Sequence, residues 1–188
     1  MLLLIGGCGV SKYNHMVAGQ EGVEGSWSEI QNQYKRRFDL VPQLVETVKG
    51  AANFEKSTIT AVTEARASVG KLQVPDTIPD DPAALEAYMA AQSKLGSSLG
   101  RLLLVAENYP NLKASQNFLG LQDQLEGTEN RIAVARRDYI DTVKAFNTSI
   151  RKFPNNLIAS SFGFEKVPQL EFDSGVQDVP SVDFNFDD

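Results

Sequence analysis

The sequence has very few of the side chains on which metal and acid–base chemistry usually depend. It contains a single cysteine, Cys8, which excludes an internal disulfide. It contains a single histidine, His15, which removes sites built on several histidines. Glu126 and Glu129 have the spacing of a helical carboxylate pair, but the Glu-x-x-His motif of di-metal bundles is missing. We therefore predict no metal site, no cofactor, no catalytic residue and no enzymatic activity.

Basic residues are scarce near the C-terminus. After Asn156 the sequence has one base, Lys166, against seven acids: Glu165, Glu171, Asp173, Asp178, Asp183, Asp187 and Asp188. This segment therefore carries a charge of −6, which equals the net charge of the whole 188-residue chain, so that the preceding body is neutral. A protein that binds nucleic acid needs a basic face, and we therefore predict no nucleic-acid partner.

Proline is absent between Asn111 and Phe153, and apolar residues recur there at steps of three and four. This period predicts one helix, which at ~1.5 Å per residue is roughly 60 Å long. Because such a helix cannot bury its apolar stripe alone, other helices must lie along it. The stripe consists of Phe118, Leu121, Leu125, Thr128, Ile132, Ala135, Tyr139, Val143, Phe146, Ile150 and Phe153.

A second long stripe predicts a first helix that starts near Lys12. Pro42 lies inside this stripe, but the stripe keeps its phase across the proline. We therefore predict a continuous, kinked helix that ends between Gly50 and Asn53. The alternative is a break at Asp39–Pro42, with Asp39 capping a new helix. The stripe consists of Val23, Trp27, Ile30, Tyr34, Phe38, Val41, Val45 and Val48.

Two shorter helices are predicted between these long ones. The second helix covers residues 54–72 and is followed by a proline-rich loop over 74–82. Asp81 before Pro82 is a cap followed by proline at the first helical position, which predicts a third helix to about Asn108. The turn after it is short, so the third and fourth helices must be antiparallel.

These elements predict an all-α fold, an elongated antiparallel up-and-down four-helix bundle with an irregular C-terminal tail. We divide the chain into a hydrophobic N-terminal segment (1–11), the bundle (12–154) and an acidic, largely irregular tail (155–188). Within the tail, residues 182–186 alternate like a short strand.

The N-terminal segment opens with the apolar residues Met1–Ile5, which are too few to cross a membrane. Ile5-Gly6-Gly7-Cys8 loosely fits a bacterial lipobox, in which the cysteine becomes lipidated. We therefore predict membrane attachment through the N-terminus, with Cys8 as the lipid attachment site. The alternative is a frayed apolar terminus with a buried thiol.

A dense set of charged residues lies beside the predicted apolar seams. One interpretation is a set of interhelical ion pairs that fix the alignment of the helices. The other is a polar groove that binds an anionic group or a partner protein. The set comprises Arg36, Arg37, Arg66, Arg101, Glu126, Glu129, Arg131, Arg136 and Arg137.

Several segments resemble the LemA family of bacterial proteins. They are Arg36–Gly50, Leu99–Arg101, Glu107–Leu112, Asn117–Leu119, Gln124–Ile132, Arg136–Arg137, Ile150–Arg151, Phe153–Pro154 and Phe162–Phe164. The resemblance covers nearly the whole chain. It implies an elongated four-helix bundle on an N-terminal membrane anchor, without known catalytic residues. Many members carry a full hydrophobic span where this chain has a short apolar start and Cys8.

We therefore expect a membrane-anchored, non-catalytic scaffold or adaptor for protein–protein interaction. It would be held at a bacterial membrane, on the extracytoplasmic side, by a lipid or by a single N-terminal span. The alternative is a self-assembling structural protein of the cell envelope. The partner is either an unidentified protein or a second copy of the chain.

Overall fold

The computed structural model describes residues 2–51, 53–72, 78 and 81–169. It is all-helical in these ranges, which confirms the all-α part of the predicted fold. The described part has six helices rather than four, because two short helices, α4 and α6, are present in addition to the four long ones. Their bounds are α1 Leu2–Lys49, α2 Lys56–Lys71, α3 Pro82–Ala106, α4 Pro110–Lys113, α5 Gln116–Arg151 and α6 Asn155–Phe162.

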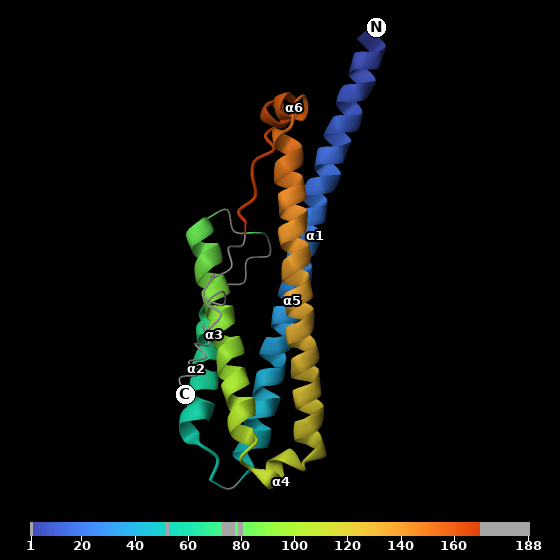
Figure 1. Ribbon diagram of the computed structural model, residues 1–188. Helices are drawn as coiled ribbons and strands as arrows, with labels where there is room; N and C mark the ends of the chain where they lie inside the picture. The colour runs from blue at the N-terminus through green and yellow to red at the C-terminus, as the bar shows by residue number, and fades with distance from the viewer. Residues whose placement is uncertain (1, 52, 73–77, 79–80, 170–188) are drawn as a thin grey trace, which may run out of the picture.

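The two longest helices, α1 and α5, lie side by side and run in opposite directions (Figure 1). Each buries the apolar stripe read from its sequence: in α5 every stripe residue from Phe118 to Ile150 is buried except Leu121, which is half-buried. A Cβ atom added to Gly19 of α1 would lie 3.1 Å from the ring of Phe146 in α5. A glycine here lets the two backbones approach closely.

Helices α2 and α3 form a shorter pair that packs against one half of α1 and α5 (Figure 1). The N-cap prediction for α3 is confirmed: the Asp81 side chain accepts a hydrogen bond from the Ala83 backbone N–H at 3.0 Å, and Pro82 opens the helix. Beyond the start of α3, α6 and the segment that follows it pack against the long pair (Figure 1).

The core consists of two apolar clusters. One joins α1, α2, α3 and the start of α5 around Leu44 and Leu99, and the other joins α1, α3, α5 and α6 around Trp27 and Tyr139. In each of α1, α3 and α5, one polar residue is buried between the two clusters. These residues are Arg37 in α1, Gln92 in α3 and Thr128 in α5.

The first helix starts at Leu2, so the predicted start near Lys12 was wrong. The helix continues through Pro42 and ends at Lys49, which confirms a continuous helix rather than a break at Asp39. Pro42 has no N–H, so the carbonyl of Phe38, four residues earlier, loses its helical donor. Arg66 of α2 takes that place, since its Nε donates to the Phe38 oxygen at 3.2 Å. Its guanidinium also lies over the Phe38 ring, 3.8 Å from the centroid.

Two predicted boundaries of the last long helix were wrong. The helix starts at Gln116 rather than Asn111, because α4 forms a separate turn that buries Leu112. The chain breaks between them, where Ser115 takes an extended backbone conformation. Phe153, the last residue of the predicted stripe, lies past the end of α5 and is 80% exposed.

The prediction of an irregular tail from Asn155 was wrong for its first eight residues, which form α6. Gly163, with φ of +76°, ends this helix, and the Phe164 N–H donates to the Ala159 carbonyl at 3.0 Å. The following segment, to residue 169, is irregular and is fixed to α5 by Asn147, whose side chain bonds both the N–H and the carbonyl of Val167. The predicted strand at 182–186 lies outside the described residues.

Candidate functional site

The first candidate site is the polar layer between the two core clusters, and Arg37 is its centre. Arg37 lies on the buried face of α1 and is 3% exposed. Its Nη1 donates to both Glu129 carboxylate oxygens, at 2.9 and 3.1 Å. Its Nη2 donates to the Gln92 backbone carbonyl at 2.8 Å and to the Gln92 side-chain oxygen at 2.7 Å. One guanidinium therefore joins α1, α3 and α5.

Two tyrosines surround this guanidinium. The Gln92 amide donates to the Tyr88 hydroxyl at 3.1 Å, and the Tyr34 hydroxyl contacts the Met89 sulfur at 3.7 Å. Burial raises the pKa of Tyr88 to about 12 and also raises the pKa of Tyr34, against the opposing charges of Arg136 and Arg37. Both phenols are therefore protonated at neutral pH.

A glycine makes room for the ion pair. A Cβ atom on Gly96 of α3 would lie 3.0 Å from the Arg37 Nη1. A groove of about 350 Å³ between α3 and α5 opens onto Glu129, which is 40% exposed. The charged residues that line this groove are Glu126 and Glu129, so its chemistry does not suit an anionic ligand.

The structure brings two of the nine predicted cluster residues together, Arg37 and Glu129. Arg66 contacts Phe38 instead, and Arg136 is half-buried near Tyr34. The other five lie on exposed helix faces: Arg36, Arg101, Glu126, Arg131 and Arg137. Cys8 belongs to α1, but its side chain is outside the described part, so its lipidation stays a prediction.

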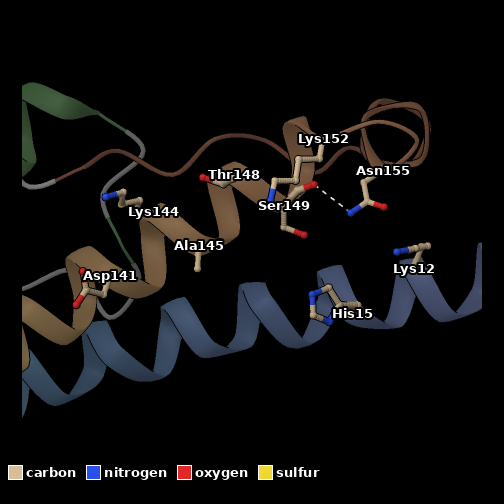
Figure 2. A pocket seen from close by; sticks show the side chains of 9 residues that line it. All are labelled: Lys12, His15, Asp141, Lys144, Ala145, Thr148, Ser149, Lys152 and Asn155. Atoms are coloured by element: carbon tan, nitrogen blue, oxygen red, sulfur yellow. Dashed lines mark hydrogen bonds between the residues drawn. The ribbon is translucent and has the colours of Figure 1, made fainter.

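The second candidate site is a groove of about 560 Å³ between α1, α5 and the start of α6. Figure 2 shows Lys12 and His15 on α1 facing a row of α5 side chains that includes Lys144 and Lys152. The hydroxyl residues Thr148 and Ser149 lie between these lysines, and the single acid of the lining, Asp141, lies at the end farthest from Asn155.

Asn155 closes the groove at its α6 end. Its amide Nδ2 donates to the Ser149 backbone carbonyl at 3.1 Å, whereas its Oδ1 is buried without a hydrogen-bond partner. Lysine amines and hydroxyl groups are donors that bind oxygen anions. The groove can therefore hold an anionic group near Lys12 and Lys152, away from Asp141.

Sequence reasoning missed this groove. Lys144, Thr148 and Lys152 follow one another at four-residue intervals, which places them on one face of α5. That spacing was a usable signal. Lys12, however, is more than a hundred residues away in the sequence, and only the packing of α1 on α5 brings it to the same face.

The end of the molecule beside this groove exposes apolar side chains. Of the eight exposed large hydrophobic residues in the described part, five lie in the segments that meet there. The ring of Tyr13 lies 4.9 Å from that of Phe162 and 5.7 Å from that of Phe164, so α1 and α6 meet through aromatic contacts. The five residues, which we call the apolar end, are Val10, Tyr13, Phe153, Leu157 and Phe162.

No helix in the described part of the chain combines the length and the apolar character that crossing a bilayer requires.

These features define a class of elongated all-helical proteins with an ion pair inside the helical stack and a cationic groove beside an apolar end. The chain belongs to the LemA family: the sequence model of that family matches residues 26–184. This confirms the family resemblance read from the sequence.

Individual relatives agree with this assignment. Protein LemA of Metamycoplasma hominis is 27% identical over 158 residues, which cover 84% of this chain and 68% of the relative. Magnetosome protein MamQ 2 of Paramagnetospirillum magneticum is 25% identical and covers 85% of this chain. Magnetosome protein MamQ of Magnetospirillum gryphiswaldense is 24% identical and covers 83%. The matches span 65% and 63% of these two MamQ proteins.

Proposed function

We propose that this protein is a membrane-associated, non-catalytic scaffold for protein–protein interaction. One observation carries the proposal: α1 runs without a break from the apolar residues Leu2–Ile5 to Lys49. A helix transmits position along its length, so an attachment at this apolar start would hold the rest of the molecule at a fixed distance and direction. At ~1.5 Å per residue, the 48 residues of α1 reach about 70 Å.

The arrangement of the long helices supports a scaffold. We interpret the half that contains α2 and α3 as an antiparallel four-helix bundle, because its cluster joins all four long helices around Leu44 and Leu99. The proposed attachment is lipidation of Cys8 or a single N-terminal span, at the extracytoplasmic side of a bacterial membrane. Membership of the LemA family supports this role, because the family resemblance implies an N-terminal membrane anchor.

The non-catalytic part of the proposal rests on the chemistry of the polar layer. The guanidinium of Arg37 bonds Glu129 and Gln92 and is enclosed by them. Burial moves the pKa of Tyr34 and of Tyr88 further above neutral pH, which makes their phenols poor proton-transfer groups there. These features suit a layer that aligns three helices.

Membrane fractionation of the full chain, expressed in bacteria, tests attachment. We expect the native chain in the membrane fraction, released by detergent but not by salt. A variant with Leu2, Leu3, Leu4 and Ile5 replaced by serine should move to the soluble fraction. The intact mass of the native chain reports whether Cys8 carries a lipid. A native chain that is fully soluble would overturn the proposal.

Photocrosslinking tests the scaffold role. A photoreactive residue placed at exposed Arg36 or Val134 should crosslink a defined partner protein in cells. The same probe at buried Leu99 is the control and should give none. Crosslinks to lipid alone, or a complete lack of crosslinks, would count against a scaffold.

A second candidate function is self-assembly, because the opposite end of the molecule is also apolar. Leu104 near the end of α3 and Leu119 near the start of α5 are both exposed. An end-to-end contact between copies would cover them together with the apolar end. Mass photometry of the L104S/L119S variant tests this: loss of oligomers that the native chain forms would favour self-assembly over a scaffold for other proteins.

A further inference from the structure

We propose that the α6 end of the molecule makes a second, peripheral contact with the surface of an anionic lipid bilayer. In this contact the groove lysines Lys12, Lys144 and Lys152 bind headgroup phosphates. The neighbouring apolar side chains enter the interface between headgroups and acyl chains. The inference deepens the proposed membrane association, on which it rests, by naming the lipid chemistry and a surface that is separate from the apolar start of α1.

The first observation is the exposed apolar area. Phe153, Leu157 and Phe162 are 80%, 58% and 64% exposed, and all three lie in or just before α6. A large apolar side chain in water is unfavourable, and a group of them commonly marks an interaction surface. Aromatic residues at such a surface suit the boundary between headgroups and acyl chains.

The second observation is local charge of the opposite sign to the chain as a whole. Residues 9–15 and 148–169, which meet at this end, contain four bases and one acid, although the net charge of the chain is −6. The bases are Lys12, Arg151, Lys152 and Lys166. Bases beside exposed apolar residues are the combination that binds peripheral proteins to anionic lipid. This charge complementarity selects an anionic bilayer as the occupant.

The third observation is position. Figure 1 shows that the start of α1 projects past α6. Tyr13 contacts Phe162 of α6, so the eleven residues of α1 from Leu2 to Lys12 lie beyond that contact. They span about 16 Å at ~1.5 Å per residue, which is roughly half of a ~30 Å hydrocarbon core. If the apolar start enters a bilayer, α6 arrives at its surface.

The groove continues this surface along the side of α5. Lys152 lines it at the α6 end, near Lys12 of α1, and Lys144 lines it eight residues earlier, toward the end that holds Asp141 (Figure 2). The hydroxyl residues Thr148 and Ser149 lie between them. The lysine amines carry the charge opposite to that of lipid phosphates and can donate hydrogen bonds to them.

Vesicle flotation of the full chain tests the inference in a background that lacks the first attachment. Leu2, Leu3, Leu4 and Ile5 are replaced by serine, so that remaining binding reports the α6 end. We expect this chain to bind vesicles that contain phosphatidylglycerol and to bind phosphatidylcholine vesicles at least tenfold more weakly. Binding to the anionic vesicles should fall as salt rises.

Two sets of matched variants in that background locate the contact. K12Q/K144Q/K152Q should weaken binding to the anionic vesicles at least tenfold. K35Q/K94Q/K113Q removes the same number of exposed lysines from distant faces and should keep most of the binding. If both sets lose binding equally, or if the serine background does not bind anionic vesicles at all, the inference is wrong.

A fluorescence measurement reports insertion. The one native tryptophan, Trp27, is buried in the core, so the F162W variant adds a tryptophan in a distinct environment. We expect its emission to shift to shorter wavelength with anionic vesicles and to be quenched by brominated acyl chains. No shift in the presence of bound vesicles would contradict insertion of α6.

The outcomes separate the inference from the proposed function. If the native chain enters membranes while the serine background ignores anionic vesicles, the α6 contact fails and the N-terminal attachment stands. If the native chain is soluble in cells but binds anionic vesicles through α6, the proposed attachment fails alone. If F153S/L157S/F162S abolishes oligomers of the chain without vesicles, the apolar end is a contact between copies, and the lipid inference is wrong.

Discussion

Arg36 and Arg37 are neighbours in the sequence and have opposite environments in the fold. Arg37 is enclosed between three helices, whereas Arg36 is exposed to solvent. A buried charge that bonds several helices specifies their alignment, because any shift of one helix leaves the charge unpaired. At the scale of the residue, Arg37 therefore does most to select one alignment of α1, α3 and α5.

The first prediction compares these two arginines. R37A removes the bonds to Glu129 and Gln92 and leaves Gln92 buried without its main partner, so we expect a loss of about 2 kcal/mol or more in the free energy of unfolding. R36A should change it by less than about 0.5 kcal/mol. Urea unfolding measures both. Equal midpoints for the two variants would contradict the assigned role of Arg37.

The second prediction concerns alkaline pH. Burial raises the pKa of Tyr88 and of Tyr139 from 10.0 to about 12, so the unfolded chain releases these phenol protons first as pH rises. The two protonated phenols therefore contribute to the free energy of unfolding. This contribution is fully present below pH 10 and is lost as pH rises towards 12. Urea unfolding over this range should show a smaller decline for Y88F/Y139F than for the native chain. Parallel declines would show that these phenols do not cause it.

At the scale of the element, the proline inside α1 is coupled to a different helix. Pro42 frees the carbonyl of Phe38, and Arg66 of α2 donates to it. A defect in the hydrogen bonds of one helix thus becomes a contact between two helices. This contact fixes α2, the shortest of the four long helices, against α1.

The third prediction is a coupling between these two residues. R66A in the native chain should lower the free energy of unfolding by about 1–2 kcal/mol, because the Phe38 carbonyl loses its donor. In the P42A background residue 42 supplies an N–H to that carbonyl, so the same substitution should cost about 1 kcal/mol less. A double-mutant cycle by urea unfolding measures the difference.

The control for this cycle is R101A, which changes an exposed arginine on α3. R101A should change the free energy of unfolding only slightly, and by the same amount in the native and P42A backgrounds. Additive effects of P42A and R66A would show that the two residues act independently, and that the contact between Arg66 and Phe38 is not a response to the proline.

At the scale of the whole molecule, the length of α1 and α5 decides the shape. The core is not a compact centre: its two apolar clusters follow one another along the helices. The α2–α3 pair supports one of these clusters most, and the other depends chiefly on α1, α5 and α6. An elongated shape and exposed apolar ends are the features that the proposed scaffold role would use.

The fourth prediction is therefore an elongated particle in solution. A compact chain of this length would have a radius of gyration of about 16 Å. A straight α1 alone spans about 70 Å, so we expect a radius above about 20 Å and a maximum dimension of at least about 70 Å. Small-angle X-ray scattering measures both. A maximum dimension near 40 Å would mean that the long helices fold back on themselves.

Local pattern was sufficient for the helices themselves. The apolar stripes from Val23 and from Phe118 predicted the long helices and most of their buried residues, because a period of three and four residues reports one face of a helix directly. Asp81 before Pro82 predicted the start of α3 for a similarly local reason. The errors fell at Ser115, Phe153 and Asn155, where contacts beyond the local sequence decide how an element ends.

Residue patterns alone predicted an all-helical fold, two long helices and the apolar face of each, and the described part of the chain agrees. Packing between helices, which no local pattern reports, pairs Arg37 with Glu129 and brings Lys12 to the groove that Lys144 and Lys152 also line. The physical reason is that helix formation and amphipathic faces depend on residues a few positions apart. The pairing of a charge or the assembly of a groove depends instead on which helices pack together and on how they are aligned along their axes.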